Sequence, residues 1–545
     1  MNKNFLISAF ILLNIFCFSQ NNSAQDLNSE MENFDEFSEN LLDYLENPRQ
    51  KEFDPSIQQK FTISGIGKIN LNAHTASFNS DSQVLNGLYE GLFSNDPKTS
   101  QAVLALAESY KISRNKKRWT FKIRENAFLS NGEKITAQTI IDSWLKIQKT
   151  PDSPYASLLD CVKGIKEFRE NKIPAEEVGL SVSGNNLVMI LNSPTPYLPN
   201  ILCHYAFSVF TGDENISSGA FVLSQKNEDS LLLKKNEKYW DAENVALNEI
   251  EVLFSSDKNQ NAFLYNTGKV NWLYSGFDSS MILNQKALVL STLFGTSYLF
   301  FTCRNPIWDN VEFRSALFSA IPWNELRKGN YIAATTLIFP LTGYPQIEGY
   351  SETDLDEAKY LMKEARKNAD IEEDKILDLT FGISDTPYMK EIALLLKNAF
   401  EPLGVNLIPF KISPDDYFSN IPYLNYDIFS YSWIGDFADP VSFLELFRDG
   451  STLNQSKWKN QKFSEFLDKA NNTLDSLERY KYLSQAEQLL LDDAIVIPIN
   501  HSIMLQTIDL ERIGGWYANA IDVHPLKTIY FKEYKNNSIP NIVKK

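Results

Sequence analysis

The sequence predicts a mixed α/β protein built from several lobes. Three observations point to this class: a length of 545 residues, a globular composition with 43% hydrophobic and 22% charged residues, and strand-like segments that alternate with helix-like ones. We find no internal repeat with a period of about 20 to 50 residues and no long low-complexity linker. The elements are therefore expected to be interleaved rather than arranged as separate beads.

The N-terminus predicts export. Lys3 precedes an apolar run over residues 5–18 that is too short to cross a bilayer comfortably, which is typical of a secretory signal peptide. We predict a signal peptide over 1–24 that delivers the mature chain to the periplasm. No later segment is apolar enough to span a membrane. A membrane anchor is one alternative. Lipid attachment at Cys17 is another, although the three residues before it lack the small side chains of a lipobox.

Residues 25–59 are predicted to form an acidic leader. Ser29 and Glu32 have the spacing of a capping box, and apolar side chains follow at helical spacing. These are Phe34, Phe37, Leu41, Leu42 and Leu45. A short amphipathic helix fits this pattern. It could dock or tether the protein, but we favour a solvated leader on the domain surface.

The body of the chain contains a series of predicted elements. Residues 119–124 alternate apolar and polar side chains as a half-buried strand does, Asn131-Gly132 marks a turn, and Thr136 caps a helix. Strands are predicted over 187–191, 231–233 and 426–433, and helical periodicity covers 355–365, 389–400 and 463–491. Strands and helices thus alternate along the whole body of the chain.

Composition argues against several classes of function. The net charge of −17 and the lack of a run rich in Lys or Arg disfavour nucleic-acid binding. With so few Cys residues a disulfide scaffold is excluded; after signal cleavage Cys161, Cys203 and Cys303 permit at most one bridge, and remaining thiols are expected to be buried. We find no nucleophile elbow, zinc-protease motif, Walker loop or Cys-x-x-Cys pair. The dispersed His residues have no ligand spacing and are expected to be structural. They are His74, His204, His501 and His524.

Asp436 and Asp439 are the one hint of catalysis. Two carboxylates near aromatic residues could serve a glycosidase. However, Asp436 follows the predicted strand after a break at Gly435, and ligands of α/β proteins commonly bind at such strand ends. An Asp beside Trp433 in a desolvated cleft suits a cation such as an ammonium group. A helix-capping role for Asp436 is the structural alternative.

Several strings, in order along residues 68–531, carry a resemblance to a known family. They are INLNAH at 69–74, LYEGL at 88–92, WTFKIR at 119–124 with NG at 131–132 and TAQ at 136–138, SPYAS at 153–157, SGAF at 218–221 with NEKYW at 236–240, NPIWDNVEFRSAL at 305–317, and WIGDFADPVSF at 433–443. Together they resemble the periplasmic oligopeptide-binding proteins, the substrate-binding components of ABC transporters in extracellular solute-binding protein family 5. Each string is modest alone, but their common order is specific.

The resemblance implies an α/β fold of the periplasmic-binding-protein type, with two lobes joined by hinge strands and an additional third domain. On that basis lobe I comprises residues 60–90, 212–297 and 505–535, the extra domain 91–211 is inserted in it, and lobe II is 298–504. Ligand would enter the open crevice and the lobes would close around it. The implied ligands are short peptides and the implied partner is an ABC permease with its ATPases. No enzymatic step, cofactor, metal or nucleic acid is implied, and the protein is expected to be a monomer.

The resemblance also implies ligand-binding residues. Asp436 matches the family's Asp that receives the peptide α-ammonium, with main-chain groups nearby pairing to the extended peptide. The other implied contacts are Trp433, Gly435 and Phe437 beside it, Tyr155 of the SPYAS string, Tyr298 and Phe300 in an aromatic run, and Ser77, Phe78 and Asn79 on a ligand-flanking loop. Ser430 stands where oligopeptide binders can place an Arg that meets the peptide carboxylate. Amine recognition is therefore better supported than carboxylate recognition.

Three readings of function remain open at this point. The first is peptide capture for an ABC importer. The second keeps the scaffold but changes the ligand to a nickel complex, a sugar or an amine-bearing small molecule. The third is a secreted hydrolase that uses Asp436 and Asp439. A receptor-like sensor or a peptide chaperone on the same scaffold is also compatible with the sequence.

Overall fold

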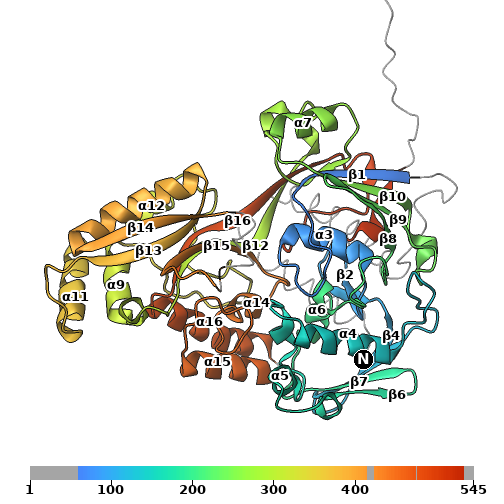
Figure 1. Cartoon of the computed structure of the whole chain (residues 1–545), viewed down its shortest axis with the longest axis horizontal. Coiled ribbons are helices and arrows are strands. Elements are labelled where there is room, and N and C mark those ends of the chain that lie inside the picture. Colours follow the sequence, from blue (N-terminus) through green and yellow to red (C-terminus); the bar gives the residue numbers. More distant parts are fainter. Residues whose placement is uncertain (1–58, 414–420, 422, 474, 533–545) are drawn as a thin grey trace, which may run out of the picture. The chain divides into compact units, whose positions relative to one another are not determined.

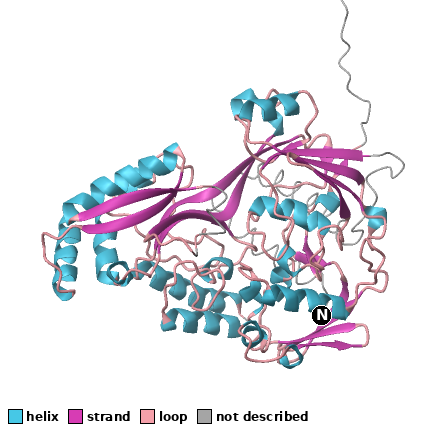
Figure 2. Cartoon of the chain, viewed as in Figure 1, coloured by secondary structure: helices cyan, strands magenta, loops and turns pink. Residues whose placement is uncertain are grey.

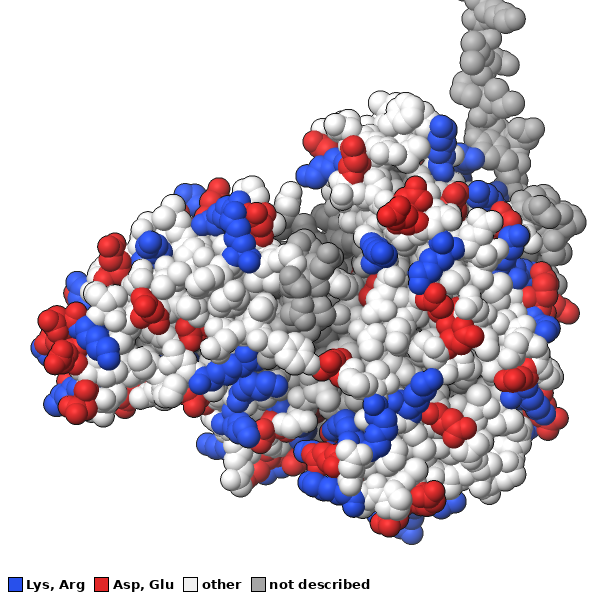
Figure 3. Space-filling view, in the orientation of Figure 1, with Lys and Arg blue, Asp and Glu red and all other residues white. Residues whose placement is uncertain are grey.

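The computed structural model of the chain describes residues 59–413, 421, 423–473 and 475–532 (Figure 1). The predicted signal peptide, Cys17 and the predicted leader helix lie outside these residues. Within the described part of the chain, no helix combines the length and the apolar character needed to cross a membrane. Lys and Arg are interspersed with Asp and Glu over the face in view in Figure 3.

A ten-stranded mixed sheet forms the frame of the described residues. In spatial order its strands are β14 (Val405–Ile412), β13 (Leu377–Ser384), β15 (Ile428–Ile434), β12 (Leu288–Phe301), β16 (Val496–Ile508), β11 (Trp272–Leu273), β1 (Gln59–Ile66), β10 (Leu247–Phe254), β9 (Ser230–Lys235) and β8 (Phe221–Lys226). Strands that are distant in sequence are neighbours, so the elements are interleaved as expected.

Two long strands join the halves of this sheet. β12 has 14 residues and β16 has 13, and they pair antiparallel along most of their length. The C-terminal part of β12 also pairs with β15, while the C-terminal end of β16 pairs with β11. Both strands are rich in the β-branched and aromatic residues that favour strands. The lobe boundaries expected after residues 297 and 504 fall inside them.

The remaining described strands form three smaller sheets. A four-stranded antiparallel sheet consists of β4 (Ala107–Ile112), β5 (Arg118–Ile123), β7 (Asn186–Ile190) and β6 (Leu180–Ser183). Two pairs consist of β2 (Phe93–Asn95) with β3 (Ala102–Leu104), and β17 (Ile513–Gly514) with β18 (Tyr530–Phe531). The four-stranded sheet lies within the stretch expected to form the extra domain.

The helices flank the sheets, as Figure 2 shows by colour. They are α3 (Asn79–Leu88), α4 (Ala137–Lys149), α5 (Ile165–Arg169), α6 (Leu198–Ile201), α7 (Lys258–Asn266), α8 (Pro306–Asp309), α9 (Val311–Ala320), α10 (Trp323–Leu326), α11 (Leu355–Asn368), α12 (Pro387–Phe400), α14 (Val441–Leu444), α15 (Gln461–Asn472) and α16 (Ser476–Asp492). α12 packs on β13 and β14, and α15 packs on α16.

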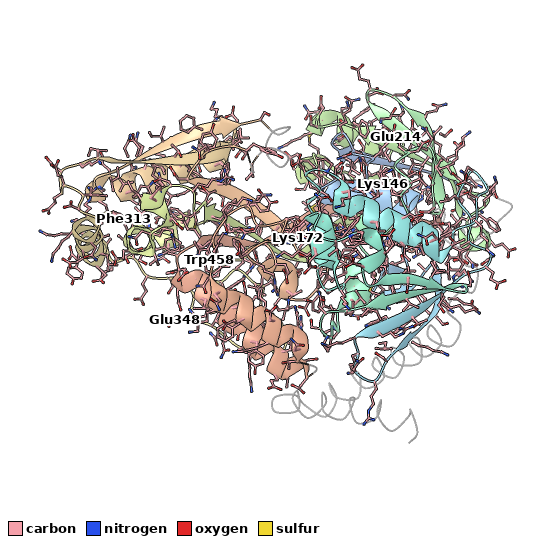
Figure 4. The ribbon with its side chains drawn as sticks, turned by 60° about the horizontal axis from the view of Figure 1, so that its bottom comes forward. Lys146, Lys172, Glu214, Phe313, Glu348 and Trp458 are labelled. Carbon is pink, nitrogen blue, oxygen red and sulfur yellow. The ribbon has the colours of Figure 1, made fainter. Side chains whose placement is uncertain are left out.

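Two large apolar cores hold these elements together. One contains Phe313 of α9 and gathers α9, α11 and α12 against β13 and β14. The other contains Trp458 and extends from β1 through α4 to α16. Both residues are labelled in Figure 4. Trp458 also donates from Nε1 to Asp493 Oδ2 at 3.0 Å, so its buried polar atom is satisfied.

Most predicted elements are confirmed. β5, β7, β9, β15, α11 and α12 overlap the segments expected to form strands or helices, and Thr136 caps α4 by accepting from the Thr139 backbone N–H at 3.2 Å. The helical periodicity expected over 463–491 is confirmed, but it is divided between α15 and α16. The chain forms two helices there, because Asp475 starts α16 as an N-cap that accepts from the Glu478 backbone N–H.

The three described cysteines are all free thiols, so the one bridge that their number allowed does not form among them. Burial raises the pKa of Cys161 and of Cys303 to about 12, and raises the pKa of Cys203 further. They are therefore protonated, unreactive thiols at neutral pH.

Candidate ligand-binding site

A cavity of about 200 Å³ brings together segments that are far apart in the sequence. Its lining comes from α3 and the two residues before it, from the end of β2, from Tyr155, from the turn at 203–205, from the end of β15 and from the segment around Ile521. The lining residues are Ser77, Phe78, Asn79, Ser82, Asn86, Asn95, Tyr155, Cys203, His204, Tyr205, Tyr431, Ser432, Trp433, Ile434, Gly435, Asp436, Ile521 and Val523.

The end of β15 delivers Asp436 to this cavity. Trp433 is paired with Thr296 of β12, and the Gly435 N–H donates to the Phe294 carbonyl at 2.8 Å. A Cβ at position 435 would lie 2.6 Å from Ser442 Oγ and 2.7 Å from the Phe294 ring, so only glycine fits this approach. The strand therefore stops against β12, and the next residue turns its carboxylate into the cavity.

Asp436 has one carboxylate oxygen that no described residue satisfies. Its side chain is 10% exposed, and Oδ2 is buried without a hydrogen-bond partner among the described residues. Oδ1 lies 3.4 Å from His204 Nε2. A buried acceptor without a donor is unfavourable, so this oxygen is a ready position for a donor on a ligand.

A backbone hydrogen bond orients His204 beside Asp436. Its Nδ1 accepts a hydrogen bond from the Ala206 backbone N–H at 3.2 Å. Since Nδ1 is occupied as an acceptor, Nε2 is the ring nitrogen that faces the carboxylate.

Aromatic rings surround the carboxylate. The Tyr155 and Tyr205 rings each lie 4.2 Å from the His204 ring, and Tyr431 is stacked on Trp433 at 6.1 Å. Burial raises the pKa values of Tyr155 and Tyr205 well above the ordinary value for tyrosine, so both hydroxyls stay neutral. Such a wall is apolar enough to strengthen an ion pair and offers ring faces to a cation.

The start of α3 forms another part of the cavity lining. Asp81 fixes it by accepting from the Asn70 backbone N–H at 3.1 Å and from the Phe78 backbone N–H at 3.3 Å. Burial raises the pKa of Asp81 to about 6, although these backbone bonds partly oppose the shift. Phe78 is 41% exposed and lines the cavity, while Asn79 donates from Nδ2 to Asp522 Oδ2 at 2.8 Å.

Much of the expected set of ligand-binding residues meets at this cavity. The residues that do so are Ser77, Phe78, Asn79, Tyr155, Trp433, Gly435 and Asp436. They come from three separate strings of the sequence. Their common position agrees with a shared site, while their roles toward a ligand stay a prediction.

Four expected residues lie in the core instead of the cavity lining. Tyr298 packs between Tyr431 and Phe447, and Phe300 stacks on Phe429 at 5.8 Å. Phe437 stacks on the Tyr197 ring at 5.8 Å, and Ser430 is 7% exposed on β15.

Sequence reasoning missed other lining residues. His204 and Tyr205 lie on a short turn far from the WIGD string, and no sequence signal connects them to it. Tyr431 could have been found, because residues two apart on a strand share one face and Trp433 was already expected at the site.

Asp439 has a structural role rather than a place in the cavity. Arg479 binds both of its oxygens, from Nη1 at 2.5 Å and Nη2 at 2.9 Å. Its Oδ1 also accepts from the Val441 backbone N–H at 3.0 Å, so Asp439, and not Asp436, caps the turn that follows. A carboxylate with both oxygens occupied is poorly placed to act as an acid or base with Asp436.

Comparisons with known proteins show a family and several relatives. Residues 101–455 match the family described as bacterial extracellular solute-binding proteins, family 5, middle region. The dipeptide-binding protein DppE of Bacillus subtilis is 25% identical over 446 residues, which cover 76% of this chain and 82% of that protein. The periplasmic oligopeptide-binding protein OppA of Salmonella typhimurium is 24% identical over 498 residues, covering 85% of this chain and 89% of that protein.

Solved structures share the fold. OppA of Haemophilus influenzae, in complex with the peptide RPPGFSPFR, has a TM-score of 0.77 at 18% identity and covers 87% of this chain and 99% of its own. The murein tripeptide binding protein MppA of Escherichia coli has a TM-score of 0.77 at 22% identity, with 88% and 99% covered. The fold expected from the resemblance is confirmed.

The chain belongs to the bacterial extracellular solute-binding proteins of family 5, because the family match covers more than half of it. Members of this family are solute-binding proteins of the cell exterior or periplasm. The resemblance drawn from the sequence strings is therefore confirmed at the level of the family.

Proposed function

We propose that this protein captures short peptides outside the cytoplasm for an ABC importer. Asp436 holds the α-ammonium group of the peptide, and Tyr155, His204 and Trp433 enclose it. The observation that carries this proposal is the buried Asp436 Oδ2, which has no hydrogen-bond donor among the described residues. A peptide ammonium supplies both the donor and the opposite charge.

The surroundings of Asp436 support an ammonium ligand in particular. A charge-assisted hydrogen bond is stronger in a site walled by aromatic rings than in water. His204 contacts Oδ1 and leaves Oδ2 available to a ligand. Related proteins are named for dipeptides, oligopeptides and murein peptides, which share a free amine.

The proposed mechanism is closure around the ligand. In the division into lobes expected from the sequence, the cavity lining draws on lobe I, the extra domain and lobe II. A ligand held by all three favours the closed form through its differential affinity for that form. The mature protein acts as a monomer without a chemical step. After removal of the signal peptide over 1–24, it docks on a permease whose ATPases drive import.

The test is mass spectrometry of the small molecules that co-purify with the protein and are released by denaturation. We expect a mixture of short peptides from the unmodified chain, and strong depletion of these peptides from Asp436→Ala. Asp142→Ala removes an exposed carboxylate on α4 and serves as the matched control, which should retain the peptides.

Two outcomes would count against the proposal. A single non-peptide species would transfer the function to another solute, such as a sugar, a nickel complex or a small amine. Peptides retained in full by Asp436→Ala would show that the ammonium is held elsewhere.

A further inference from the structure

Asp522 lies directly behind the ligand cavity. Its chain neighbours Ile521 and Val523 both line the cavity, whereas Asp522 itself is only 1% exposed. Its backbone has a φ of 50°, in the left-handed region that residues other than glycine adopt at a cost. Asn519 holds this turn, because its Oδ1 accepts from the backbone N–H groups of Ile521 and Val523, each at 3.2 Å. The turn is therefore fixed at a position that the cavity wall depends on.

Donors from several elements occupy both oxygens of the Asp522 carboxylate. Oδ1 accepts from Gln506 Nε2 at 2.8 Å and lies 3.0 Å from His524 Nε2. Oδ2 accepts from the Tyr274 hydroxyl and from Asn79 Nδ2, both at 2.8 Å. A buried carboxylate is tolerated when its oxygens are satisfied in this way. Of these four partners, only Asn79 lines the cavity.

The amide of Asn79 has one favourable orientation in this network. An ionised carboxylate accepts hydrogen bonds and cannot donate one, so the amide turns its NH2 group toward Asp522. Asn79 Nδ2 also lies 3.2 Å from the hydroxyl of Tyr274, whose proton is donated to Asp522. The hydroxyl oxygen therefore accepts from Asn79, and both N–H bonds of the amide are in use.

The amide oxygen of Asn79 is left for a ligand. Ser82 Oγ lies 3.5 Å from Asn79 Oδ1, but its single proton is donated to the Asn79 backbone carbonyl at 2.6 Å. Asn79 Oδ1 is thus an acceptor without a strong donor among the described residues, on a side chain that lines the cavity. In the proposed function Asp436 holds the α-ammonium, so the donors that remain along a peptide backbone are its amide N–H groups.

We propose that Asp522 is a positioning residue of the ligand site, which orients Asn79 so that Asn79 Oδ1 accepts a hydrogen bond from a backbone N–H of the bound peptide. This inference rests on the proposed function and adds a second point at which the peptide is held. Asp522 itself does not touch the ligand. Without its charge the amide of Asn79 is free to rotate and to present its NH2 group, which opposes a peptide N–H.

The test uses trialanine, whose side chains carry no donor, and its two derivatives that are N-methylated at the second or at the third residue. Each methyl group removes one amide N–H. Isothermal titration calorimetry on the mature protein, freed of bound peptides, gives the Kd of each ligand. We expect methylation at one of the two positions to raise the Kd about tenfold. In Asn79→Ala the same methylation should change the Kd by no more than about twofold.

Two further variants test the role of Asp522. Asp522→Asn should bind trialanine about tenfold more weakly and should lose the sensitivity to that methylation, as Asn79→Ala does. Asn79→Asp combined with Asp522→Asn exchanges donor and acceptor between the two side chains, so it should recover the sensitivity. If Asp522 were only structural, Asp522→Asn would unfold at a lower temperature and bind less peptide per chain, while the folded molecules kept their Kd and their sensitivity.

Asp427→Asn is the matched control. Asp427 is another buried carboxylate, bound to Thr380 and Asn305, and it does not line the cavity. This variant should keep both the Kd for trialanine and the sensitivity to methylation, whatever its effect on stability.

The outcomes separate this inference from the function on which it rests. Full sensitivity to methylation in Asp522→Asn overturns the positioning role. Sensitivity that persists in Asn79→Ala, or that is absent from the unmodified chain, overturns the acceptor role of Asn79 and leaves peptide capture standing. If Asp522→Asn alone does not fold, the exchanged pair decides, and its failure to recover sensitivity overturns the inference. No binding of trialanine to the unmodified chain contradicts peptide capture itself, and the inference falls with it.

Discussion

Asp436 shows how one residue can prepare a site for its ligand. In the described structure its Oδ1 faces His204, and its Oδ2 is buried without a donor. Leaving a buried carboxylate oxygen unsatisfied costs on the order of 1–3 kcal/mol or more for a charged group. An incoming ammonium removes this cost and adds a charge-assisted hydrogen bond.

Replacing Asp436 by Asn should weaken peptide binding by about 100-fold or more, because breaking a buried ion pair costs about 3–5 kcal/mol. Isothermal titration calorimetry with a peptide that co-purifies with the protein gives the Kd. The stability of the variant should not fall, since the substitution keeps the shape and removes a buried charge. Unchanged affinity in Asp436→Asn, with Asp142→Asn as the exposed control, would contradict the anchoring role.

The residue scale also shows what sequence reasoning can supply. The WIGD string placed Trp433, Gly435 and Asp436 at a strand end, and the structure brings all three to the cavity. Sequence reasoning did not show which side chains of β12 face the cavity, so Tyr298 and Phe300 were expected at the ligand. The structure places both in the apolar core. His204 was expected to be structural, and only the fold brings its turn to Asp436.

At the scale of elements, α16 anchors a long irregular segment between α10 and α11. Glu487 of α16 is fully buried, and accepts from the Ile338 backbone N–H at 2.8 Å and from the Tyr344 hydroxyl at 2.9 Å. The Leu337 carbonyl in turn accepts from Thr296 Oγ1 of β12 at 2.7 Å. The segment is thereby tied both to a helix and to β12, the strand that pairs with β15.

Glu487 gives a pH dependence with a defined sign. Burial raises its pKa to about 7 from an ordinary value of 4.5, so the folded protein binds a proton that the unfolded chain releases between these pH values. Its contribution to stability is complete below about pH 4.5 and is lost as the pH rises through 7. The variant Glu487→Gln keeps an acceptor for Ile338 and removes the titration.

We therefore expect the stability of Glu487→Gln relative to the unmodified chain to rise by about 3 kcal/mol between pH 4.5 and pH 8. Urea unfolding at several pH values measures this difference. Glu325→Gln alters an exposed glutamate and should show no such trend. A difference that stays constant with pH would show that Glu487 does not titrate in this range.

Elements with clear local signals were predictable. Alternation identified β5, and Thr136 identified the start of α4, because both signals are local to the chain. The split between α15 and α16 was missed, since apolar periodicity continues across it and the Asp475 cap was not weighed. The order of strands in the large sheet depends on contacts between distant segments, which periodicity does not encode.

At the scale of the whole molecule, hydrogen bonds join the SPYAS string to the segment after α14. Thr452 donates from Oγ1 to the Pro154 carbonyl at 2.6 Å, and its backbone N–H donates to Ser157 Oγ at 3.0 Å. Tyr197 also donates to Asn471 Oδ1 at 2.8 Å. In the division into lobes expected from the sequence, these bonds connect the extra domain with lobe II beside Tyr155. We therefore expect them to stabilise the closed form.

Replacing Thr452 by Val should raise the Kd for peptide about fivefold, mainly through faster dissociation, because the closed form loses a hydrogen bond worth about 1 kcal/mol. Stopped-flow release of a bound peptide measures the rate. Thr267→Val is the matched control, since it removes a hydroxyl bond to Phe263 at the end of α7. An equal loss in both variants, or none in Thr452→Val, would contradict a role of these bonds in closure.

The most direct measurement is a crystal structure of the protein with the peptide that co-purifies with it. The account predicts the peptide α-ammonium nitrogen within about 3 Å of Asp436 Oδ2. A ligand bound in the cavity without contact to Asp436 Oδ2, or a ligand that lacks an amine, would contradict it.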